Sequence, residues 1–130
     1  MPEHVTRVSN DMSESYESNG RIEVAPGVLT SIARLTALKV EGVRKLATPP
    51  AEVMSLFRRA TRQDGIVLSQ HDGNLVFDVY VFMDPHVNVM ETSRRLQSAI
   101  MEAIDKMVGV PVDAVNVHVE DVLYVQGDTA

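Results

Sequence analysis

The residues best suited to chemistry are histidines and carboxylates on neighbouring predicted strands. His118 and Glu120 are two positions apart in a segment that alternates valine with polar residues, so both side chains point to the same side of a strand. Asp78 and His71 belong to adjacent predicted strands and could approach them. A zinc site needs three or four converging ligands, whereas an i,i+2 pair is common on the wet face of a sheet. We therefore predict no metal or cofactor and keep a small metal-dependent domain as an alternative.

Other catalytic and phosphate-binding motifs are missing from the sequence. There is no Cys, which excludes a thiol nucleophile, cysteine-ligated zinc and iron–sulfur clusters. The seven glycines are too widely spaced for a P-loop, a dinucleotide-binding fingerprint or the G-x-x-G loop of a KH domain. No serine lies in a G-x-S-x-G elbow. The sequence predicts a protein that is not an enzyme.

Charge and hydropathy set the expected partners and location. The net charge is −6 and the pI is about 5.1, which argues against nucleic acid because phosphate binding needs a positive surface. No segment has the roughly 20 apolar residues that span a bilayer. The first 20 residues contain no apolar run, so we expect no signal peptide. We predict a cytoplasmic protein that reaches a membrane only through a protein partner.

Composition also predicts the domain organisation. Residues 1–19 are polar and acidic, and such a segment buries too little surface to offset its ordering entropy, so we expect a flexible tail. Residues 20–125 are expected to form a single domain, since 45% of the chain is hydrophobic. Residues 126–130 are expected to be a frayed end.

Hydrophobic periodicity places the main elements. A helix is predicted from Pro26, with Gly42 ending it. Two strands, 66–71 and 74–83, flank Asp72-Gly73, a type I′ turn dipeptide that pairs residue 68 with 77 and residue 66 with 79. Asp84 is the expected N-cap of a second amphipathic helix, with Pro85 in its first turn. A valine-rich strand follows at 115–119.

These elements predict an α+β fold. Two amphipathic helices, each with one apolar stripe, need a shared apolar sheet face, as in a two-layer α/β sandwich with a small mixed or antiparallel sheet. The reverse face of the sheet would then present large apolar side chains to solvent, and such patches often mark interfaces. This reverse-face patch consists of Val67, Val76, Tyr80 and Phe82.

A connector at residues 51–62 is the second candidate contact surface. It combines apolar residues with Arg58, Arg59 and Arg62 and could form a short helix. Two interpretations remain open for it and for the reverse face. Both could bind a partner, or the connector could cover the sheet with its arginines in water. Binding of RNA by the arginines is a further alternative.

The order of the motifs resembles the alkaline shock protein 23 family. The resemblance rests on GRIEVA at 20–25, a helix at 28–37, VEGV at 40–43, a strand at 79–83, MVG at 107–109 and VNVHV at 115–119. It covers about residues 20–124. The chain departs from the family pattern after residue 83, where relatives usually carry a glycine and this chain has Asp84-Pro85-His86.

The resemblance implies a bacterial protein of the cell-envelope stress response without catalytic residues. It also implies protein partners, including a membrane-anchoring protein and further copies of the chain. We therefore expect a non-enzymatic scaffold or adaptor that acts through protein–protein contacts. A regulatory partner of fatty-acid synthesis enzymes is an alternative that the resemblance leaves open.

Overall fold

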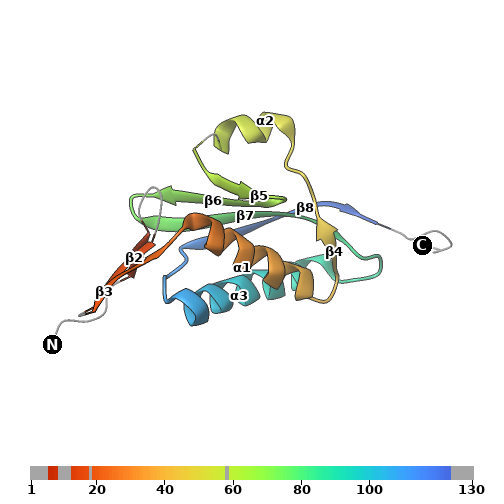
Figure 1. Cartoon of the computed structure of the whole chain (residues 1–130). Coiled ribbons are helices and arrows are strands. Elements are labelled where there is room, and N and C mark those ends of the chain that lie inside the picture. The colour runs from red at the N-terminus through yellow and green to blue at the C-terminus, as the bar shows by residue number, and fades with distance from the viewer. Residues whose placement is uncertain (1–5, 9–12, 18, 58, 124–130) are drawn as a thin grey trace.

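The structure, a computed structural model, describes residues 6–8, 13–17, 19–57 and 59–123. A five-stranded sheet carries helices α1 and α3 on one face and α2 on the other, and a separate three-stranded sheet precedes α1 (Figure 1). The elements in chain order are β1 (Thr6–Val8), β2 (Ser13–Glu17), β3 (Gly20–Val24), α1 (Pro26–Lys39), β4 (Val43–Leu46), α2 (Ala51–Met54), η1 (Ser55–Phe57), β5 (Thr61–Gln63), β6 (Ile66–His71), β7 (Asn74–Met83), α3 (Val89–Val108) and β8 (Ala114–Val122). The predicted α+β sandwich is confirmed.

Strand β7 is the centre of the larger sheet. β8 pairs with it in parallel along residues 76–83, so β8 occupies one edge. β6 pairs antiparallel with residues 74–79 and β4 with residues 81–83, so these two strands lie end to end along the other edge. β5 pairs with the outer edge of β6. The sheet is therefore mixed, with one parallel pair.

The main core lies between the sheet and the helices α1 and α3. Its sheet side comes mainly from alternate residues of β6 and β7, as period-2 strands require. Leu29 and Ala33 of α1 and Leu96 and Ile100 of α3 have no exposed surface and complete it. The two helices thus share the apolar sheet face that the sequence predicts.

The β6–β7 hairpin forms in the predicted register. Leu68 pairs with Phe77 and Ile66 with Val79. Both turn residues have positive φ, 52° at Asp72 and 84° at Gly73, as a type I′ turn requires.

The predicted start of the second helix is wrong. α3 begins four residues later, with Asn88 as its N-cap, whose side chain accepts a hydrogen bond from the Glu91 N–H at 2.9 Å. Asp84 and Pro85 lie in a loop instead. The next residue, His86, has φ of 67°, a left-handed conformation through which a right-handed helix does not continue.

The segment predicted as a flexible tail contains two strands. Strands β1 and β2 fall within residues 1–19, and β2 pairs antiparallel with all of β3. The flexibility of this segment stays a prediction. Residues 126–130, predicted to be frayed, lie outside the described residues.

Gly65 joins the three strands that meet at residue 80. The Tyr80 N–H donates to the Gly65 carbonyl at 2.9 Å, and the Ala47 N–H donates to the Tyr80 carbonyl at 2.7 Å. A Cβ at position 65 would lie 2.4 Å from the Ala47 oxygen and 2.6 Å from the Tyr80 oxygen. Backbone approaches this close, so only glycine fits there.

We expect Gly65→Ala to lower the free energy of unfolding by about 3 kcal/mol, because the added methyl forces β4 and β7 apart. Gly27→Ala is the matched control, since its Cβ meets nothing within 4 Å and alanine favours the helix. Urea denaturation measures both. Equal stability of Gly65→Ala and the unchanged protein would contradict the claim that only glycine fits at position 65.

Candidate functional site

The connector covers part of the reverse face of the sheet, which corrects the expected exposure of Val67 and Tyr80 in the reverse-face patch. Val67 has no exposed surface and Tyr80 is 3% exposed, while Val76 and Phe82 are partly buried. The physical reason is a second, smaller core between the sheet and the segment that follows β4, with α2 on this side of the sheet (Figure 1). This core consists of Ala47, Val67 and Tyr80, with Val53, Ala60 and Phe82 packed against it.

The predicted polar residues of this face do come together. Asp78 is buried, and its Oδ1 lies 2.9 Å from His118 Nε2 and accepts a hydrogen bond from Asn116 Nδ2 at 3.2 Å. The His118 ring stacks on Tyr80 with centroids 4.2 Å apart. An aspartate that orients a histidine can serve proton transfer or metal binding.

No group of three or more metal-ligating side chains occurs among the described residues. His71 was predicted to be able to approach His118 and Glu120, but its side chain is not among those that the structure describes. What the structure does provide is therefore a hydrogen-bonded pair in which Asp78 is buried and the His118 side chain is 38% exposed.

The surroundings of Tyr80 oppose ionisation of its hydroxyl. Burial raises the pKa of Tyr80 above its ordinary value of 10.0, and the carboxylates of Asp78 and Glu120 raise it further because they repel a phenolate. Tyr80 is therefore a neutral, packed side chain at physiological pH.

The two described arginines of the connector, Arg59 and Arg62, do not belong to the smaller core on the reverse face. Arg59 and Arg62 are exposed, and Arg62 Nη1 lies 2.8 Å from the Met54 Sδ of α2. Arg58 lies outside the described residues. Of the alternatives for this region, the covering role of the connector is the one seen.

Exposed apolar side chains lie elsewhere, with three of them on the outer side of α1 and others at Leu56 of η1 and at Met90 and Met107 of α3. Val28, Leu35 and Leu38 are 46%, 54% and 40% exposed. Their spacing of seven and three residues places them on one side of the helix, opposite the residues that α1 buries in the core. This outer face of α1, defined by the three side chains, is apolar. A helix that is apolar all round is normally buried on all sides.

Helix α3 is the internal comparison, because it covers the same sheet face. Its outer side is charged, and Arg95 pairs with Glu91 at 2.6 Å and Lys106 with Glu102 at 3.3 Å, as the i,i+4 spacing predicts. α1 has only Arg34 and Lys39 as charged residues. The outer side of α3 therefore carries more charge than that of α1, although α3 also exposes Met90, Met101 and Met107.

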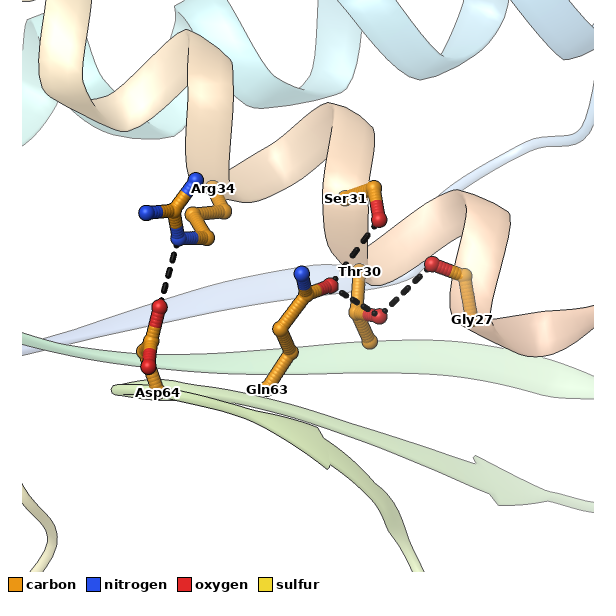
Figure 2. A network of polar contacts seen from close by, with 6 residues as sticks. All are labelled: Gly27, Thr30, Ser31, Arg34, Gln63 and Asp64. Atoms are coloured by element: carbon orange, nitrogen blue, oxygen red, sulfur yellow. Dashed lines mark hydrogen bonds and ion pairs between the residues drawn. The ribbon is translucent and has the colours of Figure 1, made fainter.

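Polar contacts fix the rotation of α1 about its axis. Arg34 Nε donates to Asp64 Oδ2 at 2.5 Å, and Ser31 Oγ donates to Gln63 Oε1 at 3.0 Å (Figure 2). The buried hydroxyl of Thr30 also lies 3.1 Å from Gln63 Oε1. These bonds join α1 to the end of β5 and the following turn, and Ser31 lies between Val28 and Leu35 on the same side of the helix as the exposed apolar residues.

The outer face of α1 was not predicted from the sequence, because only the apolar stripe that faces the core was identified in the first helix. The signal was present in residues 28, 35 and 38, which are apolar at positions where an amphipathic helix carries charge.

Comparison with known proteins agrees with the fold and the motif order. The alkaline shock protein 23 family, which is described as having a cell envelope-related function, matches residues 14–124. The chain belongs to this family. The match begins within the segment predicted as a tail, at strand β2.

Relatives of this family member occur in Gram-positive bacteria. An uncharacterized protein of Streptococcus pyogenes, Spy1535, is 32% identical over 80% of each chain. The uncharacterized protein YqhY of Bacillus subtilis is 25% identical over 77% of this chain and 75% of its own. No solved structure gives a significant match. Within the described residues, no helix has the length and apolarity needed to cross a bilayer.

We expect Tyr80→Phe to lose less stability than the unchanged protein as the pH rises above roughly 10. The folded-state pKa of Tyr80 is raised, so its stabilising effect is present below the unfolded value of 10.0 and is lost as the pH passes the folded value. Chemical denaturation at several alkaline pH values measures the difference. Parallel pH profiles for the two proteins would show that Tyr80 is not shielded.

Proposed function

We propose that this member of the family is a non-enzymatic adaptor of the cell envelope, which binds a partner protein through the outer face of α1. The observation that carries the proposal is the apolar character of α1 on the side away from the core, at Val28, Leu35 and Leu38. The family's envelope-related function supplies the setting.

The energetics of these side chains favour a protein contact. Fully burying one Val or Leu side chain stabilises by about 1.5–3 kcal/mol relative to exposing it, and roughly half of each is still exposed. The three residues span about 15 Å along the helix at 1.5 Å per residue. This length fits the apolar stripe of a partner helix, which contacts its target at i, i+3 and i+7 positions.

The rigidity of α1 supports the same function. Its inner side is fixed by the core, and one flank is fixed by the bonds of Ser31 and Arg34 to the end of β5 (Figure 2). A preorganised surface binds without the entropy cost of ordering itself. The partner that we propose is a membrane-anchoring protein, with a second copy of the chain as the other occupant to be tested.

The double variant Leu35→Glu with Leu38→Glu tests the proposal. We expect it to weaken partner binding by about a hundredfold or more, because two carboxylates would lose water and two leucines their apolar contact. Affinity purification from the organism that encodes the chain identifies the partner, and calorimetry with the purified partner measures the loss. Light scattering shows whether the partner is another copy.

Met90→Glu is the matched control, since Met90 is 62% exposed on α3 and receives the same charge. The control should bind as the unchanged protein does, and all variants should unfold at similar temperatures. If the double variant retains the same partners at the same affinity, the outer face of α1 is not the contact surface.

A further inference from the structure

A groove lies at the end of the domain where α1 ends and α3 begins. Its walls are the turn between α1 and β4, at Glu41 and Gly42, and the loop from β7 to α3, and the first turns of α3 complete it. It encloses about 410 Å³, which is within the range of small-ligand sites. Neither the reverse-face patch nor the outer face of α1 contributes to its lining.

Three carboxylates line the groove, and two of them already have cationic partners. Asp84 pairs with Arg44, and Glu91 pairs with Arg95. Glu41 has no ion pair within the described part of the chain. The local charge is therefore negative by one unit, and the unpaired carboxylate stands at the wall formed by the α1–β4 turn.

Thr92 provides an independent indication of a ligand. It lines the groove, is 2% exposed, and its hydroxyl has no hydrogen-bond partner among the residues that the structure describes. Its backbone N–H, by contrast, donates to the Asn88 carbonyl at 2.9 Å. An unsatisfied buried hydroxyl costs about 1–3 kcal/mol, so its retention needs a reason.

The turn that carries Glu41 packs against Thr92, although the side chain of Glu41 itself is exposed. Gly42 follows Glu41 in the chain, and a Cβ at Gly42 would lie 3.2 Å from Thr92 Oγ1. Gly42 has φ of 101° and its carbonyl accepts the Asp84 N–H at 2.8 Å, which fixes the turn against the loop. Across the described ranges, the lining of the groove therefore includes an unpaired carboxylate and an unpartnered hydroxyl.

We propose that this groove binds an alkylammonium group, as carried by a lysine side chain or a free diamine. The ammonium donates to the Glu41 carboxylate and to Thr92 Oγ1, and its methylene chain lies along Pro85 and Val87, which also line the groove. A metal ion fits less well, because no group of three ligating side chains occurs within the described segments. This site is independent of the proposed adaptor surface.

Titration of the isotopically labelled protein with 1,5-diaminopentane, followed by amide chemical shifts, tests the site. We expect shifts confined to residues around the groove, including 41, 42 and 92. Nα-acetyl-lysine amide is titrated in parallel and separates the two sources: binding of both compounds indicates a lysine side chain, and binding of the diamine alone indicates a free diamine. Tetramethylammonium, with the same charge and no N–H donor, should cause no such shifts.

Two variants complete the test. Glu41→Gln and Thr92→Val should each weaken binding about tenfold, whereas Glu102→Gln, an exposed carboxylate on α3 paired with Lys106, should leave it unchanged. Thr92→Val should also melt at the same or a higher temperature, because it removes an unsatisfied hydroxyl. Absence of shifts with either amine, equal binding by both variants, or a lower melting temperature of Thr92→Val would overturn the proposal.

Discussion

The arrangement of the molecule depends on the near-complete enclosure of strand β7. Both of its edges are paired, by β8 on one side and by β6 and β4 end to end on the other. Both of its faces are covered, since Phe77, Val79 and Val81 lie under α1 and α3 while Tyr80 lies under the connector. The close backbone approach at Gly65 is what allows β4 and β6 to share one edge. Because little of β7 is left exposed, the outer elements offer most of the surface for contacts.

Because the sheet is largely covered, the helices provide much of the surface at which a partner could bind. α3 and α1 lie on the same sheet face, but α3 exposes alternating charges and α1 exposes Val28, Leu35 and Leu38. The same core would be served by an α1 with polar residues at these positions, so folding does not require them. The proposed contact with another protein would account for their apolar character, and the family's described function concerns the cell envelope.

Local sequence patterns predicted most of the fold. Which side chains remain exposed depended on how distant segments pack, and the sequence did not predict that. The β6–β7 register followed from Asp72-Gly73 and period-2 alternation, because both depend only on neighbouring residues. Burial of Tyr80 could not be predicted, since it depends on where the connector packs, and a helix as short as α2 has little intrinsic preference. The α3 start was missed because Asp84-Pro85 imitates a cap, whereas Asn88 caps the helix. The sequence predicted that Asp78 and His118 lie on adjacent strands, but it did not predict the hydrogen bond between them.

Site-specific photo-crosslinking in living cells tests the central claim most directly. A photoreactive amino acid is placed at position 35, on the outer face of α1, and separately at position 98, an exposed serine on the outer side of α3. The account predicts a discrete protein adduct from position 35 and none from position 98. Equal adducts from the two positions, or an adduct from position 98 alone, would contradict the assignment of α1 as the contact surface.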